Sequence, residues 1–290
     1  MSDLPLSWPA PAKLNLLLHI TGRREDGYHE LQTVFQFLDY GDGLRFEPRL
    51  DGKILRLENI EGIPVDDDLV VKAARALQQV CGCELGVDIS LDKKLPMGAG
   101  LGGGSSDAAT TLHALNKIWQ CALSNDELAE IGLKLGADVP VFVHGFSAFA
   151  EGIGERLTPI ELPEPWYLVI TPNIHVPTGA IFGDLELTRD CSAIKIRGLQ
   201  DSGWSNVCLP VVAKHYPEVA QALEILGQYA EARMSGTGAS VFAAFETEAE
   251  AKKVRAKLRE PTKAEIPASW NDFIAKGVNT SPLQEQLNNL

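Results

Sequence analysis

The sequence has no hydrophobic run long enough to cross a membrane, and it does not begin with a basic stretch followed by an apolar core. A membrane-spanning helix needs about 18 to 20 apolar residues in succession, and a secretory leader needs the basic-then-apolar order. We therefore expect a cytoplasmic protein without a membrane partner. Hydrophobic residues make up 45% and charged residues 22% of the 290 residues, which is ordinary for a globular protein and unlike a disordered chain or a coiled coil.

Positive charge is also scarce, since 26 Lys and Arg stand against 39 Asp and Glu, giving a net charge of −13. Nucleic-acid binding needs many cationic side chains to neutralise phosphates, so we expect no nucleic-acid partner. A small anionic ligand would have to be held by local donors instead. No stripe typical of an interface is recognisable, and we expect a monomer or a weak homodimer.

Metal-binding and redox motifs are missing. The five cysteines, Cys81, Cys83, Cys121, Cys191 and Cys208, are odd in number and scattered, as is usual in a reducing compartment. The spacing of Cys81 and Cys83 does not fit a CxxC site, and the six histidines form no HExxH pair. We therefore expect no dedicated protein site for a metal.

The hydrophobic pattern predicts a mixture of strands and helices. Alternation over residues 12–20 indicates a strand with one apolar face, and Lys13 and Asn15 point to its other face. Further strands are expected at 31–38, 44–46, 87–91, 166–171, 240–245 and 273–278, with a turn at 39–43 between the first two. Helices are expected at 69–80, directly after residue 104, and at 125–136, 217–226 and 248–258.

The composition changes near residues 158–165, where Pro159, Pro163 and Pro165 fall within seven residues. We place a domain boundary there, which gives domains of residues 1–158 and 159–290. The strands and helices do not alternate strictly, so two α+β units are expected and not a parallel βα sheet.

Glycine is concentrated in one loop, because five of the seven residues from Gly98 to Gly104 are glycine. Backbone N–H groups in such a loop can approach an oxyanion closely, since no Cβ intervenes. A helix that begins directly after it adds the positive end of its dipole and free N–H donors. We interpret this segment as a phosphate cradle formed by Pro96, Met97, Gly98, Ala99, Gly100, Leu101, Gly102, Gly103, Gly104, Ser105 and Ser106.

The glycine loop also fits different kinds of site. A Walker A loop needs a Lys after its glycines, and none follows here. Residues 98–103 satisfy GxGxxG, so a dinucleotide-dependent oxidoreductase is an alternative, although Pro96 separates the loop from the preceding strand. The acids about 20 residues further on, Asp126 and Glu127, belong to a helix-opening capping box. A turn that only caps a helix is the simplest alternative.

Three segments in order resemble the motifs of the GHMP small-molecule kinases: Pro11-Ala12-Lys13-Leu14-Asn15-Leu16, the glycine loop, and Met234-Ser235-Gly236-Thr237-Gly238-Ala239-Ser240. Gly27-Tyr28-His29 and Gly136-Ala137-Asp138-Val139-Pro140 narrow the resemblance to the family that phosphorylates 4-diphosphocytidyl-2-C-methyl-D-erythritol in non-mevalonate isoprenoid synthesis. This resemblance implies an N-terminal domain like ribosomal protein S5 domain 2, a C-terminal ferredoxin-like domain, and ATP with Mg²⁺ as cofactors.

The resemblance implies catalytic roles for Asp138 and Lys13. Asp138 would take or orient the proton of the acceptor hydroxyl, and Lys13 would offset charge on the transferring phosphoryl group. From the sequence alone, Asp138 could simply cap the next helix, with Pro140 in its first turn. Lys13 could be an ordinary solvated lysine. Ser105 or Ser106 could meet the Mg²⁺ that accompanies ATP.

Substrate contacts are implied for Asn15, Tyr28, His29, Thr178 and Phe182. His29 would read the cytosine and Phe182 would stack on it, although a structural histidine and a core phenylalanine are ordinary alternatives. Phe35 could line the same pocket or pack in the core. The third motif, Gly236, Thr237 and Gly238, is less specific. So are the candidates for the nucleotide side, Asp68, Leu69 and Lys94. Asp68 could belong to a solvated helix start, and Lys94 could lie at a solvated strand end.

The sequence departs from the wider superfamily after the glycines, where Ser-Ser-Ala is common and this chain has Asp107. We interpret Asp107 as a variation at the helix start, where a carboxylate suits the dipole. Two further hypotheses stay open beside the dinucleotide enzyme. One is a sister GHMP kinase for another alcohol, such as homoserine or mevalonate, and the other is a nucleotide sensor without turnover.

Overall fold

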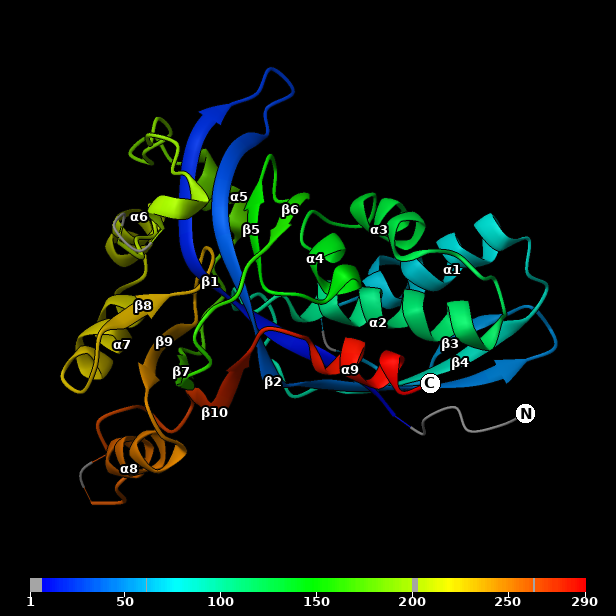
Figure 1. Ribbon diagram of the computed structural model, residues 1–290. Coiled ribbons are helices and arrows are strands. Elements are labelled where there is room, and N and C mark those ends of the chain that lie inside the picture. The colour runs from blue at the N-terminus through cyan, green and yellow to red at the C-terminus, as the bar shows by residue number, and fades with distance from the viewer. Residues whose placement is uncertain (1–6, 61, 200–202, 263) are drawn as a thin grey trace.

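The computed structural model describes residues 7–60, 62–199, 203–262 and 264–290 (Figure 1). Strands and helices follow one another irregularly along the described chain, which confirms the α+β class. The strands are β1 (Trp8–Arg23), β2 (His29–Arg49), β3 (Ile54–Arg56), β4 (Gly86–Asp92), β5 (Ala148–Glu151), β6 (Arg156–Pro159), β7 (Trp166–Thr171), β8 (Ala232–Met234), β9 (Val241–Phe245) and β10 (Asn271–Val278). The helices are α1 (Leu69–Cys81), α2 (Gly103–Ile118), α3 (Asn125–Leu133), α4 (Val139–His144), α5 (Thr178–Gly183), α6 (Leu209–His215), α7 (Pro217–Gly227), α8 (Glu248–Leu258) and α9 (Pro282–Asn288), with 3₁₀ turns η1 (Val65–Asp67) and η2 (Ile196–Gly198).

The long strand β2 connects the sheet. It pairs with β1 along one edge, and with β5, β10 and β4 in turn along the other. From β10 the sheet continues through β7 and β9 to β8, and β3 extends it beyond β4. Helices α1 to α4 lie on one side of the long β1–β2 ribbon in Figure 1, and α6, α7 and α8 lie on the other.

The prediction of two strands separated by a turn at 39–43 is wrong, because β2 runs without a break through these residues. Gly41 shows why glycine occurs in this part of β2, where a neighbouring strand approaches closely. A Cβ at this position would lie 2.1 Å from the carbonyl oxygen of Ala10, so glycine lets β1 approach β2 where their register shifts. The neighbouring Asp42 is buried and does not belong to a solvated turn.

The helix signals are confirmed with their caps. The Asp68 carboxylate accepts from the N–H of Val70 at the start of α1. Ser124 forms a capping box at the start of α3, and Thr247 forms one at the start of α8. Each cap satisfies a backbone donor that the helix itself leaves free, a contribution of about 1 kcal/mol.

The last helix returns to the first half of the chain (Figure 1). Leu283 of α9 packs with Trp8 and Ala114, and the side-chain amide of Gln284 donates to the Val143 carbonyl. The expected boundary at 158/159 falls within β6. The division into two domains therefore stays a prediction.

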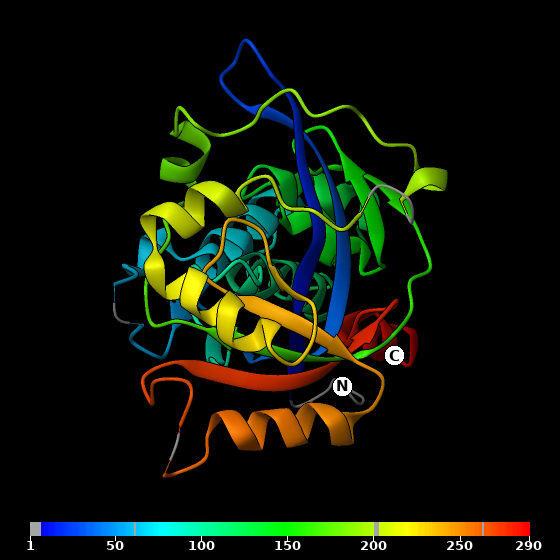
Figure 2. The same ribbon diagram turned by 90° about the vertical axis from the view of Figure 1, so that its left-hand side faces the viewer.

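Residues 184–199 cross over the β1–β2 ribbon and residues 203–208 return along the outer edge of β1, a course that the sequence did not predict (Figure 2). The Cys191 amide donates to the Ile20 carbonyl, and Asn206 forms a bridge with Leu18. The Ile194 backbone is held by the side chain of Gln32. This segment thereby covers the strand that would otherwise be a free sheet edge.

One pair of cysteines could not be recognised from the spacing in the sequence. Cys81 and Cys121 form a disulfide, whereas Cys83, Cys191 and Cys208 are free. The expectation of scattered, unpaired thiols is thus wrong for two of the five, because α1 packs along α2 and brings the end of one beside the end of the other. Within the described ranges, no helix is long and apolar enough to span a membrane.

Candidate active site

A cavity of about 970 Å³ opens between β1, the glycine loop and α5, and both halves of the chain line it. It collects most of the residues that the sequence singled out. These are Lys13, Asn15, Tyr28, His29, Phe35, Asp68, Leu69, Pro96, Met97, Gly98, Ala99, Gly100, Gly102, Gly103, Gly104, Ser105, Asp138, Thr178, Phe182, Gly236 and Thr237. Four candidates are not among its lining residues, namely Lys94, Leu101, Ser106 and Gly238.

Lys13 and Asp138 meet on this cavity although 125 residues separate them in sequence. The Lys13 Nζ atom lies 3.4 Å from the Asp138 Oδ2 atom. Asp138 occupies the N-cap position of α4, but its side chain makes no capping hydrogen bond. The alternative that Asp138 only caps the helix is therefore wrong. Its side chain is 37% exposed and can face a substrate.

Lys13 is not a solvated lysine, because its side chain is only 3% exposed. Its ammonium donates to the side-chain oxygen of Asn15 and, over 3.1 Å, to the carbonyl of Gly100. The same ammonium lies 5.4 Å from the centre of the Phe35 ring, a cation–π distance. These three contacts are uncharged and hold the ammonium in place, and the carboxylate that pairs with Lys13 is that of Asp138.

The third motif lies beneath the glycine loop and is tied to β1. The Ser235 hydroxyl donates to the Gly100 carbonyl over 2.8 Å and accepts from the Asn15 N–H over 3.0 Å. The Asn15 amide also donates to the Thr33 hydroxyl. The side-chain amide of Asn15 is therefore hydrogen-bonded within the protein, with its oxygen accepting from Lys13 and its nitrogen donating to Thr33.

The backbone of the glycine loop suits an anion. Gly98, Gly100 and Gly102 have φ values of 62°, 76° and 74°, which favour glycine. The carbonyls of residues 99–101 accept hydrogen bonds from Ser240, Ser235 and Lys13. No described residue accepts from the N–H groups of residues 98–105. The loop thus turns its acceptors toward the protein and leaves its donors unpaired, as a phosphate cradle requires.

The two serines after the loop differ in position. Ser105 lines the cavity, whereas Ser106 is fully buried and its hydroxyl has no hydrogen-bond partner. Only Ser105 is placed to meet a ligand in this cavity. Among the described residues, no group of three or more His, Cys, Asp or Glu side chains could hold a metal ion.

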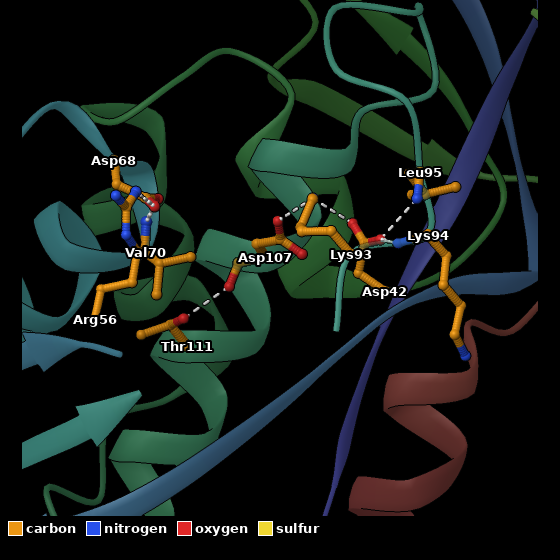
Figure 3. A network of polar contacts seen from close by, with 9 residues as sticks. All are labelled: Asp42, Arg56, Asp68, Val70, Lys93, Lys94, Leu95, Asp107 and Thr111. Atoms are coloured by element: carbon orange, nitrogen blue, oxygen red, sulfur yellow. Dashed lines mark hydrogen bonds and ion pairs between the residues drawn. The ribbon is translucent and has the colours of Figure 1, made fainter. Parts of the chain in front are cut away.

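Figure 3 shows two buried ion-pair groups beside the loop. In one, Arg56 pairs with Asp68 over 2.6 Å. Asp68 thus starts α1 as expected, but it is buried and paired, so the expected solvated helix start is wrong. Both of its carboxylate oxygens are engaged, one by Arg56 and one by the N–H of Val70.

In the other group, the ammonium of Lys93 lies between the carboxylates of Asp42 and Asp107 (Figure 3). Asp42 also accepts from the N–H groups of Lys94 and Leu95, the residues that lead into the glycine loop. The group therefore joins the entry of the loop to α2 at its exit. The interpretation of Asp107 as a carboxylate that suits the dipole at the helix start is wrong, since α2 has no acidic residue in its first turn and the buried Asp107 side chain pairs with Lys93.

Burial raises the pKa of the Asp107 carboxyl to about 7. The nearby charge of Lys93 opposes this rise, and the charge of Asp42 adds to it. One Asp107 oxygen has no hydrogen-bond partner, which is costly for an ionised carboxylate in a buried position. The site beside the loop thus contains a carboxyl that titrates near neutral pH.

Lys94 is turned away from the main cavity. Its ammonium pairs with Asp92 over 3.7 Å, and it lines a smaller cavity of about 330 Å³ together with Tyr40 and Pro282. Of these two neighbouring lysines it is Lys93 that lines the main cavity, and the sequence motifs did not indicate it. The alternation of β4 could have found it, because Val87, Ile89 and Leu91 point inward and residue 93 continues that face.

The far end of the cavity is formed by the loop between β1 and β2 and by α5. Tyr28 is exposed, and the rings of His29 and Phe182 are 5.2 Å apart between centroids. Burial, with the charges of Arg189 and Arg23, lowers the pKa of His29. This end thus offers two aromatic rings and a neutral imidazole to a flat ligand.

Thr178, at the start of α5, hydrogen-bonds through its hydroxyl to the Thr237 hydroxyl over 3.0 Å. The third motif is thereby joined to the helix that carries Phe182. Phe35 lines the cavity but is 1% exposed and packs in the core. It supports Lys13 and has little surface for a substrate.

The topology excludes one alternative. The strand before the glycine loop, β4, pairs antiparallel with β2, and the helix after the loop leads to α3 and not to a parallel neighbouring strand. A dinucleotide-binding unit needs a parallel βαβ crossover. The GxGxxG match is therefore incidental, and the oxidoreductase hypothesis is wrong.

Comparisons with known proteins agree with this site. The models for the GHMP kinases N terminal domain and the GHMP kinases C terminal match residues 68–146 and 193–264. The curated 4-diphosphocytidyl-2-C-methyl-D-erythritol kinase of Pseudomonas syringae pv. syringae (strain B728a) is 56% identical over 287 residues, which cover 99% of both chains.

Solved structures share the fold. A crystal structure of 4-(cytidine 5'-diphospho)-2C-methyl-D-erythritol kinase matches with a TM-score of 0.78 and 30% identity, over 93% of this chain and 98% of that chain. Homoserine kinase from Cytophaga hutchinsonii matches with a TM-score of 0.67 and 15% identity over 98% of both chains, which is a likeness of fold alone.

The fold, the free donors of the loop and the two family matches agree that the protein is a small-molecule kinase of the GHMP class. The identity to curated relatives extends over nearly the whole chain and is far more specific than the fold. On that ground the chain belongs to the 4-diphosphocytidyl-2-C-methyl-D-erythritol kinase family.

Proposed function

We propose that the protein transfers the γ-phosphoryl group of ATP to the 2-hydroxyl of 4-diphosphocytidyl-2-C-methyl-D-erythritol, a step in non-mevalonate isoprenoid synthesis. The observation that carries this proposal is the position of the Lys13–Asp138 pair. It lies on one cavity that has the glycine loop on one side and Tyr28, His29 and Phe182 on the other. A donor phosphate and an aromatic-bound acceptor can therefore both reach the pair.

The ATP phosphates would bind along residues 98–105. Their N–H groups have no acceptor among the described residues, and α2 presents its N-terminus directly after them. Leu69, Met97 and Lys93 line the adjoining wall and would face the nucleoside. The nucleotide end of the cavity would thus be formed entirely by the first half of the chain.

In the transfer step, the 2-hydroxyl oxygen forms a bond to the γ-phosphorus while the bond from that phosphorus to the bridging oxygen of ADP breaks. Asp138 would accept the hydroxyl proton, or orient the hydroxyl until the proton leaves. Lys13 would stabilise the charge on the transferring group, and its fixed contacts mean that little reorganisation is needed.

Mg²⁺ is expected with the nucleotide. Of the two serines after the loop, Ser105 would offer its hydroxyl to the ion, because Ser106 is buried and does not line the cavity. The ion would be held chiefly by phosphate oxygens and would neutralise their charge. With no carboxylate cluster among the described residues, its affinity should depend on bound ATP.

Two observations favour a cytidyl acceptor over homoserine or mevalonate. Phe182 and His29 form an aromatic pair at the acceptor end, which suits a flat base and has no purpose for a small aliphatic acid. Arg189 and Arg23 add positive charge near His29, which suits a diphosphate ester. The hypothesis of a nucleotide sensor without turnover does not explain why a buried Lys13 is paired with Asp138 on the cavity.

We further propose that the protein works in the cytoplasm as a monomer or a weak homodimer, without nucleic acid. A net charge of −13 disfavours binding to polyanions. Sedimentation at increasing protein concentration tests the oligomeric state directly, and cell fractionation tests the location.

The function is tested by measuring ADP release with MgATP and a panel of acceptors. We expect turnover with the cytidyl substrate and none with homoserine or mevalonate at equal concentration. Phosphorus NMR of the product should show a new phosphomonoester on the methylerythritol carbon 2. Turnover with another alcohol would leave the class intact and refute the acceptor, and ATP binding without any turnover would support the sensor.

A further inference from the structure

The segment that follows Phe182 is folded around one arginine. Arg189 donates from Nη2 to the carbonyl of Phe182 over 2.9 Å and to that of Asp184 over 2.5 Å. From Nη1 it donates to the carbonyl of Leu187 over 3.0 Å. These three bonds close the turn after α5 around the guanidinium and fix the end of the helix that carries the Phe182 ring.

The fourth bond of Arg189 reaches a different part of the chain. Its Nε donates to the Nε2 atom of His29 over 3.1 Å, although 160 residues separate the two. A guanidinium has donors and no acceptor, and it stays protonated in proteins. The Nε2 atom must therefore present its lone pair. A neutral imidazole that accepts at Nε2 carries its proton on Nδ1.

The surroundings keep this imidazole neutral. Burial lowers the pKa of His29, and the charges of Arg189 and Arg23 lower it further. The carboxylate of Asp184, on the same turn, pairs with His215 at 2.9 Å. Among the described residues, none accepts from Nδ1 of His29. A single donor thus remains free on a ring that lines the cavity.

We propose that Arg189 is a positioning residue that fixes His29 as an Nδ1–H donor and holds Phe182 beside it, so that the pocket accepts cytosine and rejects uracil. This deepens the proposed function and rests on it for the identity of the base. Cytosine presents an unprotonated N3 to an N–H donor. Uracil carries a proton on N3, so two donors would face each other and one buried polar group would lose its partner.

The geometry gives Arg189 two separable effects. Its Nη bonds shape the Phe182 turn, and its Nε bond selects the tautomer of His29. Loss of the turn alone would weaken stacking of any pyrimidine. Loss of the tautomer would instead let His29 accept as well as donate, and the preference for cytosine over uracil would fall.

The direct test is nitrogen NMR of the ligand-free protein labelled at histidine, with His29→Gln to assign the signals. In the wild-type protein at pH 7.5 we expect His29 Nδ1 to be protonated and Nε2 to be unprotonated. In Arg189→Met we expect a mixture of tautomers and a pKa of His29 closer to its ordinary value. A wild-type spectrum with the proton on Nε2 would overturn the proposal.

Kinetics give the second readout. We expect Arg189→Met to raise KM for the cytidyl substrate about 10- to 100-fold, with kcat and KM for ATP within about threefold of wild type. The pKa of His29 should rise toward its ordinary value, because the ring loses a positive neighbour. The ratio of kcat/KM for the cytidyl substrate to that for its uridyl analogue should fall at least tenfold.

Controls separate this role from folding and from the proposed function. Arg197→Met removes the same charge from the 3₁₀ turn η2 of the same segment, which does not line the cavity, and it should leave every value unchanged. Arg189→Lys keeps the charge but lacks the fork of N–H donors, and it should restore the pKa of His29 more than the base preference. If Arg189→Met does not fold, the wild-type spectrum still decides. Absence of turnover with the cytidyl substrate would refute the proposed function and leave the spectrum as an independent test of the tautomer.

Discussion

At the scale of single residues, the site depends on charges that are buried and held by fixed partners. Lys13 is enclosed by Asn15, Gly100 and Phe35, so in the proposed reaction it would meet the phosphoryl group without rearranging. In a site shielded from water such a preorganised charge is worth far more than on the surface. Its effect should appear in the rate and much less in binding.

Lys13→Met should therefore lower kcat about 10²- to 10³-fold and leave KM for ATP within about threefold. The fold should tolerate it, because an apolar side chain of similar length replaces a buried ion. Steady-state kinetics and thermal unfolding measure both quantities. Lys94→Met is the control, since this lysine is turned away from the cavity. A large rise in KM with unchanged kcat would show that Lys13 only binds the nucleotide.

Asp107 makes stability depend on pH. Its pKa is about 7 in the folded protein because of burial and about 3.9 in an unfolded chain. Between these values the folded state holds a proton that the unfolded state has lost, so this group makes stability fall as pH rises from 4 to 7. Above pH 7 the carboxyl is ionised in both states, and its destabilising effect on the folded protein no longer changes with pH.

Asp107→Asn removes this titration while keeping an oxygen that can accept from Lys93. We expect its free energy of unfolding, relative to wild type, to increase steadily between pH 4 and 7 and to level off above. Urea unfolding at five pH values measures the difference. A difference that does not change with pH would mean that Lys93 keeps Asp107 ionised throughout.

Some of these residues could be predicted from the sequence and others could not. The motifs led to Lys13, Asp138 and the glycine loop, because their chemistry depends on residue types in a local pattern. Arg189 could not be found this way, since its partner His29 lies 160 positions earlier in the chain. Only the fold brings Arg189 and His29 together, and the composition of neither segment indicates the contact.

At the scale of elements, the glycine loop works because its neighbours approach it closely. A Cβ on Gly100 would lie 2.2 Å from the Ser235 carbonyl oxygen, and the φ of 76° is itself unfavourable for other residues. The same logic explains the misplaced turn at 39–43, where glycine allows strand contact and not a reversal of the chain. Glycine content alone does not distinguish these uses.

Gly100→Ala should destabilise the protein by about 2 kcal/mol or more and raise KM for ATP about tenfold, because the loop must move away from Ser235. Chemical unfolding and ATP titration measure the two effects. Gly227→Ala is the matched control, since an added Cβ there meets nothing within 4 Å. Equal stability of both variants would contradict the close packing of the loop.

At the scale of the whole molecule, the two ligands should bind from opposite ends of one cavity. The nucleotide end comes from the first half of the chain, and the acceptor end also uses α5 and the third motif. The long β1–β2 ribbon crosses the molecule (Figure 1), and Lys13 of β1 lines the cavity. Stabilisation by the two ligands should therefore be independent, apart from their meeting at the transferred group.

Each ligand at 100 times its Kd should add about 2.7 kcal/mol to the free energy of unfolding. With a non-hydrolysable ATP analogue and the cytidyl substrate together, the two increments should be additive within about 0.5 kcal/mol. Thermal unfolding with each ligand and with both measures this. Mutual exclusion of the ligands would show that they compete for one end of the cavity.

We expect Asp138 to serve the transfer step at the point where the two ends of the cavity meet. The most direct measurement is the single-turnover rate of Asp138→Asn with both substrates saturating, beside their dissociation constants. We expect a rate about 10²- to 10⁴-fold lower, with both dissociation constants within about threefold of wild type. A variant that transfers phosphate at the wild-type rate would contradict it.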